Sequence, residues 1–119
     1  MITQEKGRIA EQNALAYLKT QGLKLITQNY RCRLGEIDLI MRDKETLVFI
    51  EVRSRISAQF GGGIASVTYA KRQKIIKTAT LYMLEHQKFE QFALRFDVIS
   101  LDGKSGTINW IKDAFGADY

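Results

Sequence analysis

Two runs of alternating apolar and polar residues constrain the fold of this chain more than any other feature of its sequence. Residues 36–42 and 47–54 both alternate with a period of two, which is the period of a β-strand with one buried face. Only the polar residues 43–46 separate the two runs. The pattern therefore predicts a β-hairpin over residues 36–54.

The apolar pattern also predicts how the two strands pair. If Asp43 lies opposite Thr46, the same register places Asp38 opposite Glu51. A slip of one residue would mix the faces, so the pattern supports this register. One face of the hairpin is then entirely apolar and carries Ile37, Leu39, Met41, Val48, Ile50 and Val52.

The other face carries a pair of acids with a chemical consequence. Two carboxylates directly opposite each other have Cβ atoms about 5 Å apart and repel. A divalent cation bridging Asp38 and Glu51 would offset this repulsion, because Mg²⁺ is held by carboxylates, backbone carbonyls, water and phosphate oxygens. Arg53 follows on the same face and is suited to contacting a phosphate. The alternative is a solvated, charged sheet face, but the neighbouring Ile40 and Phe49 favour a covered acid pair.

The remaining sequence indicates one α/β domain over residues 1–119. Apolar residues with helical spacing precede Gly22, a candidate helix-ending residue, and Ser66 is a candidate cap for a second helix. The order is αβββαββ, a mixed central sheet flanked by helices. The predicted elements are a helix at 5–21, strands at 23–32, 36–42 and 47–54, a helix at 67–86, and strands at 92–101 and 107–111.

Composition narrows the classes of site and partner. One cysteine, Cys32, and one histidine, His86, exclude an internal disulfide and an ordinary zinc site. Any metal would therefore be held by oxygen. The chain has no long apolar segment typical of a membrane span or a signal peptide, which favours a cytoplasmic protein. Eighteen Lys and Arg against thirteen Asp and Glu give a formal charge of +5, which favours a polyanionic partner.

A family resemblance rests on combined motifs across nearly the whole chain. GEIDLI at 35–40, VFIEVRSR at 48–55, the Phe60-Gly61 pair, Ser66-Val67 with Lys71 and Lys74, and RFDVIS at 95–100 are similar to the bacterial YraN-like family. That uncharacterised family resembles Holliday junction resolvases and other PD-(D/E)XK nucleases, which implies a restriction-endonuclease-like three-layer fold.

The resemblance also implies roles for individual residues. Asp38 takes the place of the metal-binding aspartate of the superfamily, and Glu51 that of its second acid. Glu11, on the first predicted helix, takes the place of an additional carboxylate ligand. The backbone carbonyl of Val52 would complete the metal shell, and the implied ion is Mg²⁺ or Mn²⁺. Without the resemblance, Glu11 would be interpreted as a solvent-exposed helix residue.

Arg53 departs from the superfamily pattern, which has lysine at this position. Arginine can stabilise charge on a phosphate but stays protonated, so it cannot act as a general base. Activation of water would then fall to the metal or to a carboxylate such as Glu11. Candidate nucleic-acid contacts are Arg53, Arg55, Lys71 and Lys74, although the two lysines also fit a solvated helix face.

The first functional hypothesis is a metal-dependent DNA endonuclease that hydrolyses phosphodiester bonds, with Asp38, Glu51, Arg53 and Glu11 as catalytic residues. Branched or damaged DNA are candidate substrates. The alternative is a nucleic-acid-binding protein with a nuclease-like fold and little or no catalysis. An interaction module unrelated to nucleic acid is a third hypothesis. Likeness to junction resolvases makes a homodimer a candidate assembly.

Overall fold

The computed structural model describes residues 2–55 and 67–116, with side chains for residues 7–54 and 67–116. Five strands form one sheet in the order β1-β2-β3-β4-β5. All neighbours are antiparallel except β3 and β4, which are parallel and need a crossover between them. The elements are α1 (Ile2–Thr20), β1 (Lys24–Cys32), β2 (Gly35–Asp43), β3 (Thr46–Arg55), α2 (Tyr69–Glu85), the 3₁₀ helix η2 (Gln87–Phe89), β4 (Ala93–Asp102) and β5 (Ile108–Phe115).

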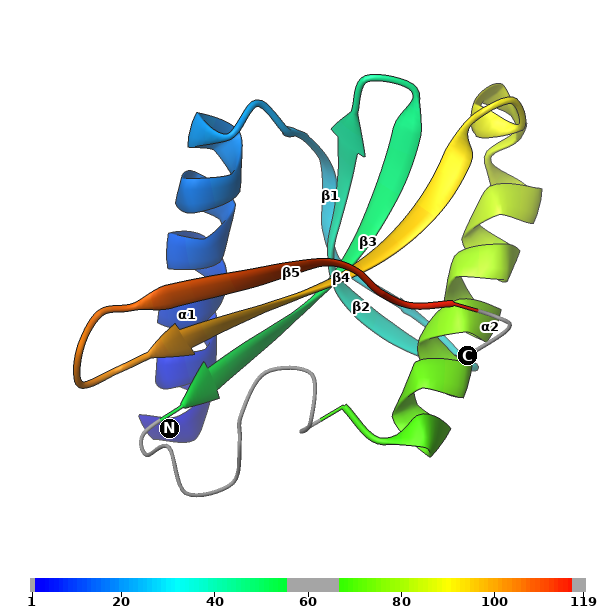
Figure 1. Ribbon diagram of the computed structural model, residues 1–119. Helices are drawn as coiled ribbons and strands as arrows, with labels where there is room; N and C mark the ends of the chain where they lie inside the picture. The colour runs from blue at the N-terminus through cyan, green and yellow to red at the C-terminus, as the bar shows by residue number, and fades with distance from the viewer. Residues whose placement is uncertain (1, 56–66, 117–119) are drawn as a thin grey trace.

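One helix covers each face of this sheet, which gives three layers (Figure 1). The predicted order αβββαββ and the mixed sheet flanked by helices are both confirmed. On the α1 side, the core includes Ala14, Leu18, Leu39 and Ile50. On the α2 side, it is rich in aromatic residues and contains Phe49, Tyr82, Phe89, Phe96 and Phe115.

Local signals explain where the helices begin and end. Gly22 has a positive φ of 96°, and the Gly22 and Leu23 amides donate to the Lys19 and Leu18 carbonyls. This is the hydrogen-bond pattern of a Schellman motif with glycine at C′, as the sequence predicted. The start of α2 differs from the prediction, because Thr68 is the N-cap and its hydroxyl accepts from the Lys71 amide. The predicted cap Ser66 lies outside the described residues.

The last strand is longer than predicted because a bulge lets it continue. Pairing of β4 with β5 shifts register between Phe96 and Val98, and Asp113 has a positive φ of 52° at the irregularity. Beyond it, Phe115 pairs with Phe96 and is 1% exposed. Alternation in the sequence stops at residue 111, and so the continuation could not be predicted from it.

The hairpin of β2 and β3 has the predicted register, but its ladder is short. Leu39 pairs with Ile50, and the pairing runs from there to Asp43 and Thr46 at the turn. Residues of β2 before Leu39 pair with β1, whereas residues of β3 after Ile50 pair with β4. The two strands therefore part at Asp38 and Glu51, as the diverging ends of β2 and β3 show in Figure 1.

Gly35 sets the distance between the start of β2 and α2. A Cβ at this position would lie 2.9 Å from the hydroxyl oxygen of Thr78, a buried residue of α2. Such a contact requires a shift of helix or strand, so only glycine allows this close approach. Within the part of the chain that the structure describes, neither helix has the length and apolar character to cross a membrane.

Candidate active site

Asp38 lies at the point where β2 and β3 separate. Its Oδ2 accepts a hydrogen bond of 2.8 Å from the Val52 amide, a backbone donor that β2 would satisfy if the ladder continued. A strand residue points its N–H and C=O to the same edge, so the Val52 carbonyl also faces the gap between the strands. The predicted direct pairing of Asp38 with Glu51 is thus replaced by a side-chain bridge from Asp38 to β3.

The Asp38 and Glu51 side chains nevertheless lie together. Burial, repulsion from Glu51 and a hydrogen bond to the Glu51 side chain raise the pKa of Asp38 to about 7, while the Val52 amide acts in the opposite direction. Glu51 itself is 5% exposed. Two carboxyl groups this close, one buried and one half-buried, either share a proton or need a cation.

Glu11 stands near this pair without joining it. Burial, opposed by a hydrogen bond to Asn29, raises the pKa of Glu11, and repulsion from Glu36 and Glu51 acts in the same direction as burial. Among the residues with described side chains, no group of three or more Asp, Glu, His or Cys side chains is placed to hold a metal ion. The described carboxylates at this site therefore form a pair with a third acid at longer range.

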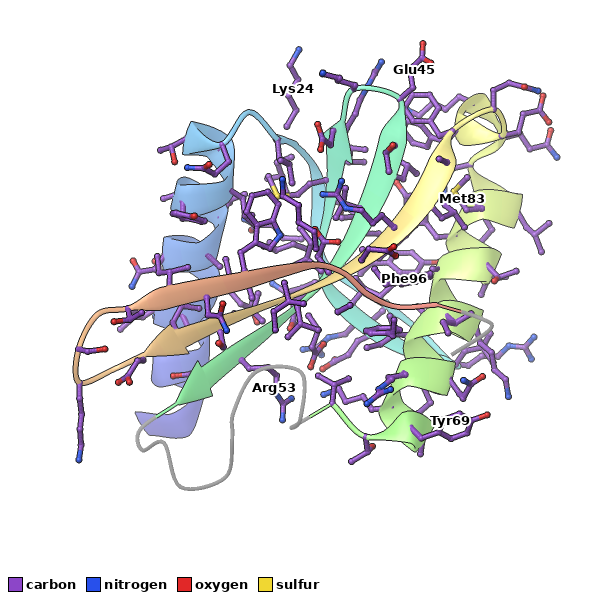
Figure 2. The ribbon with its side chains drawn as sticks, in the orientation of Figure 1. Lys24, Glu45, Arg53, Tyr69, Met83 and Phe96 are labelled. Atoms are coloured by element: carbon purple, nitrogen blue, oxygen red, sulfur yellow. The ribbon has the colours of Figure 1, made fainter. Side chains whose placement is uncertain are left out.

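Two cations face Glu51. Arg53 Nη1 lies 3.1 Å from Glu51 Oε2, and Lys71 Nζ lies 2.8 Å from the same oxygen. Arg53 comes from β3 itself, and its side chain projects away from the strand in Figure 2. Lys71 comes from the first turn of α2. The site thus combines two acidic and two cationic side chains from β2, β3 and α2.

Sequence reasoning missed the contact between Lys71 and Glu51. It placed Lys71 with Lys74 on a basic helix side, and only the position of α2 against β2 brings the Lys71 ammonium to the acid pair. Lys74 is exposed and packs its Cβ near Gly35. Arg55 ends β3, and its side chain lies outside those that are described.

Asp97 and His86, which lie outside the acid pair, make contacts that stabilise the fold. Because Phe96 and Val98 flank Asp97 in an alternating run, the sequence predicts that Asp97 points away from the core, but it is completely buried. It accepts hydrogen bonds from Arg95, from Trp110 Nε1 and from the Asp113 amide. These contacts fix the β4–β5 bulge, which agrees with a structural role. His86 is the C-cap of α2, with Nδ1 2.8 Å from the Tyr82 carbonyl oxygen, which is a common role for a histidine at a helix C-terminus.

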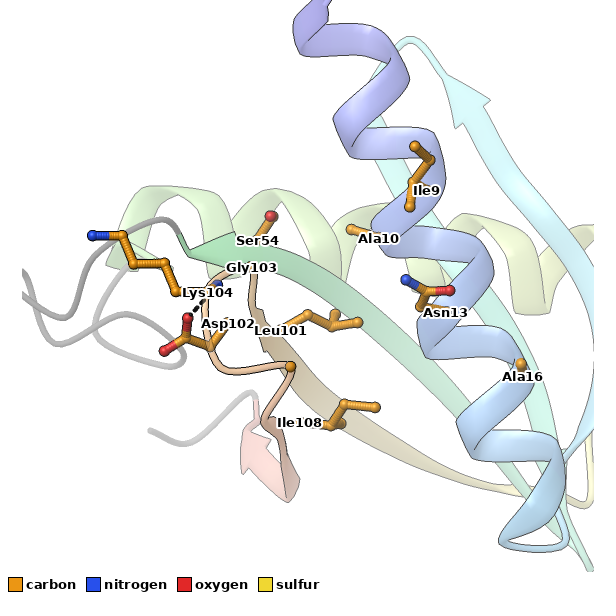
Figure 3. A pocket seen from close by; sticks show the side chains of 11 residues that line it. Ile9, Ala10, Asn13, Ala16, Ser54, Leu101, Asp102, Gly103, Lys104 and Ile108 are labelled. Carbon is orange, nitrogen blue, oxygen red and sulfur yellow. Dashed lines mark hydrogen bonds between the residues drawn. The ribbon is translucent and has the colours of Figure 1, made fainter.

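A hollow of about 640 Å³ lies on the α1 side of the sheet, between α1 and the β4–β5 turn (Figure 3). Ile9, Leu101 and Ile108 give it apolar walls, and Lys104 lies at its edge. Neither Asp38 nor Glu51 lines it. This hollow is therefore separate from the acid pair, so cavity size does not locate the candidate site.

Comparison with known proteins agrees with the motifs. The model of the Uncharacterised protein family UPF0102 matches residues 10–101. The chain belongs to this family. The UPF0102 protein of Legionella pneumophila (strain Corby) is 62% identical over 116 residues, covering 98% of both chains. That of Psychromonas ingrahamii is 55% identical over 112 residues, covering 92% of this chain and 88% of its own.

A third UPF0102 protein, from Nitrosomonas europaea, is 50% identical over 111 residues and 92% of each chain. The predicted YraN-like family is confirmed, and the matched region includes both strands that carry the acid pair. Because the family is uncharacterised, a function has to be argued from the site.

Proposed function

We propose that this member of UPF0102 is a metal-dependent nuclease that hydrolyses phosphodiester bonds of DNA. Asp38 and Glu51 hold a divalent cation, and Arg53 and Lys71 contact the phosphate. The observation that carries the proposal is the meeting of the buried Glu51 carboxylate with the half-buried Asp38 carboxylate where β2 and β3 part, with two cations facing Glu51.

The residues present fit a hard divalent cation. Asp38 and Glu51 supply anionic oxygen ligands, the Val52 carbonyl faces the same gap, and Mg²⁺ uses few protein ligands while retaining water and phosphate oxygens. A bound Mg²⁺ or Mn²⁺ would supply a Lewis acid that orients the phosphate and lowers the pKa of the attacking water. The raised pKa of Asp38 reflects burial and repulsion, and a cation would relieve the repulsion.

The cations next to Glu51 have complementary roles in this proposal. Arg53 offers a planar fork for two phosphate oxygens but cannot accept a proton. Lys71 is a compact charge on a flexible stem, anchored by its contact with Glu51. Both side chains place positive charge where a phosphate would approach the acid pair, which stabilises charge that develops during hydrolysis. Glu11, at longer range, remains the candidate for orienting water.

A cleavage screen tests the proposal. Purified protein is incubated with linear, nicked, flapped and four-way DNA in the presence of Mg²⁺, Mn²⁺ or EDTA. We expect metal-dependent cleavage of at least one structure and none by Asp38→Asn. If the wild-type protein leaves every structure intact with both metals, the proposal is wrong. The screen also distinguishes branched substrates from linear ones.

Arg53 provides a quantitative prediction. Arg53→Ala should lower the cleavage rate by roughly 10²-fold or more, because it removes a preorganised positive charge near the phosphate. Arg53→Lys should retain part of the rate, since it keeps the charge but loses the planar fork. Single-turnover rates measure the effect, and Lys77→Gln, which removes an exposed α2 charge outside the candidate site, is the matched control. Equal rates for wild type and Arg53→Ala would remove Arg53 from the mechanism.

A second candidate function is nucleic-acid binding with little or no catalysis. Its support is that Glu51 is already paired with Arg53 and Lys71, so the acid is neutralised within the chain. In that case Asp38→Asn should bind DNA as the wild type does, and Mg²⁺ should leave the melting temperature of both proteins unchanged.

A further inference from the structure

A group of positive charges lies at the turn end of the hairpin, away from the acid pair. Lys24 of β1 and Arg42 of β2 are directly opposite each other, and like charges in this position repel. Lys88 of η2 joins them around a hollow of about 600 Å³, and no acidic residue lines that hollow. Its remaining lining residues are Leu25, Ile26, Phe89 and Phe92. We refer to this feature as the cationic hollow.

The cations of the cationic hollow lack a direct ion-pair partner in the part of the chain that the structure describes. Among the described residues, none of Lys24, Arg42 and Lys88 takes part in an ion pair. The cations near the candidate active site differ, since Arg53 and Lys71 both contact Glu51. Three such cations around one concave surface produce a local positive potential that attracts an anion.

Arg42 is held in place within this group. Its Nε donates a 2.7 Å hydrogen bond to the Lys44 carbonyl, and its guanidinium carbon lies 4.8 Å from the centre of the Phe92 ring. Lys88 Nζ lies 5.2 Å from the centre of the Phe89 ring. The ring contact and the Nε hydrogen bond restrain the Arg42 guanidinium and leave its terminal N–H groups for a ligand, and such a fork matches the oxygens of a phosphate.

We propose that the cationic hollow binds a backbone phosphate of DNA as a second contact, separate from the acid pair. The inference rests on the DNA partner of the proposed function but not on cleavage. Arg42 follows Asp38 by four residues on one strand, a separation of about 13 Å. Duplex DNA advances about 3.4 Å per base pair along its axis, so one short duplex is long enough to reach both contacts. Figure 2 shows Lys24 and Arg53 at opposite ends of the sheet.

Salt-dependent binding tests the inference in EDTA, where no cleavage occurs. The hollow variant is Lys24→Gln with Lys88→Gln, which spares the stacked Arg42. The control is Lys19→Gln with Lys104→Gln, two exposed lysines outside the cationic hollow whose replacement changes the net charge equally. Affinity for a short DNA duplex is measured by fluorescence anisotropy between about 50 and 200 mM salt. Thermal melts check that both variants are folded.

We expect the hollow variant to bind more weakly and to reduce the slope of log K against log salt by about 0.9 for each phosphate that is no longer neutralised. The control should keep the wild-type slope. Identical slopes for the two variants, or no binding by wild type at low salt, would overturn the inference. A titration with inorganic phosphate tells whether the ligand of the cationic hollow is free phosphate or DNA. If the hollow variant lost phosphate binding but bound DNA as the wild type does, the inference would also be overturned.

These outcomes are independent of the proposed cleavage. A protein that cuts no DNA but shows reduced affinity and slope in the hollow variant supports the second contact and contradicts nuclease activity. A protein that cuts DNA with unchanged affinity in the hollow variant contradicts the second contact alone.

Discussion

Two aspartates of this chain, the buried Asp97 and the half-buried Asp38, have opposite surroundings. Asp97 on β4 is fully buried, and both of its oxygens accept hydrogen bonds from the Arg95 guanidinium, with further donors from Trp110 and Asp113. Asp38 on β2 accepts a backbone hydrogen bond from Val52 and faces a second acid, Glu51.

This contrast separates a structural carboxylate from a candidate functional one. A buried carboxylate whose lone pairs are filled by donors of the same chain stabilises the fold, and it leaves little capacity for a ligand. A carboxylate that is buried beside another acid is unfavourable in its charged form. Such a site is a candidate for binding an external cation, and such perturbed acids cluster at functional sites.

Removing the structural carboxylate should have the largest effect. Asp97→Ala leaves the Arg95 charge without its main partner and frees buried donors, so we expect the free energy of unfolding to fall by about 3–5 kcal/mol. Urea denaturation measures the change. A decrease below about 1 kcal/mol would mean that Arg95 is satisfied by Asp43 alone, and Asp97 would then have no special structural role.

Replacing Asp38, the candidate functional carboxylate, should raise stability relative to wild type at neutral and higher pH. The pKa of Asp38 is about 7 in the folded chain against an ordinary value of 3.8, so between these values the folded state binds more protons than the unfolded state. Stability contributed by this group is present at low pH and decreases as pH rises through that range. Asp38→Asn, which can still accept from the Val52 amide, should lack this decrease.

Melting temperatures of wild type and Asp38→Asn in EDTA, recorded from about pH 4 to about pH 8, check this prediction. The difference between the two proteins isolates the Asp38 contribution from other titrating groups. Asp38→Asn should become the relatively more stable protein as pH rises. A constant difference across the range would show that the pKa of Asp38 is not raised in the folded chain by burial and by Glu51.

The smallest expected effect concerns Lys71. Its ion pair with Glu51 is partly exposed on the lysine side, so Lys71→Gln should cost at most about 1 kcal/mol in EDTA. Divalent cation should stabilise the variant at least as much as wild type, because the acid pair keeps its negative charge. Lys74→Gln is the matched control, and its melting temperatures in EDTA and with divalent cation should equal those of the wild type. If Lys71→Gln no longer responded to metal, Lys71 would be needed to organise the acid pair.

Much of the fold follows from alternation and helical spacing. The register of β2 with β3 was predictable because one slip would have exposed Leu39 or Ile50. Alternation assigns faces, however, and does not say where a ladder ends. The parting of the strands at Asp38, and the position of Ile37 in the core beneath α2 rather than beside Leu39, depend on the twist of the whole sheet.

The candidate site was predictable only in its strand residues. Asp38, Glu51 and Arg53 lie on two neighbouring strands, so local pattern alone relates them. Lys71 reaches Glu51 because Gly35 lets α2 approach β2, a long-range contact that spacing within one helix does not encode. The position of Lys24 opposite Arg42 likewise depends on the pairing of β1 with β2. The register of this pairing shifts at a bulge near Leu25.

Calorimetric titration of Mn²⁺ into the metal-free protein decides whether the acid pair is a cation site. It is carried out at about pH 8, above the raised pKa of Asp38. Glu36→Gln, which removes an exposed acid paired with Arg31, is the control. We expect one Mn²⁺ bound by wild type and by Glu36→Gln, and none by Asp38→Asn or Glu51→Gln. Equal binding by wild type and Asp38→Asn, or no binding by wild type, would contradict the assignment of a metal to Asp38 and Glu51.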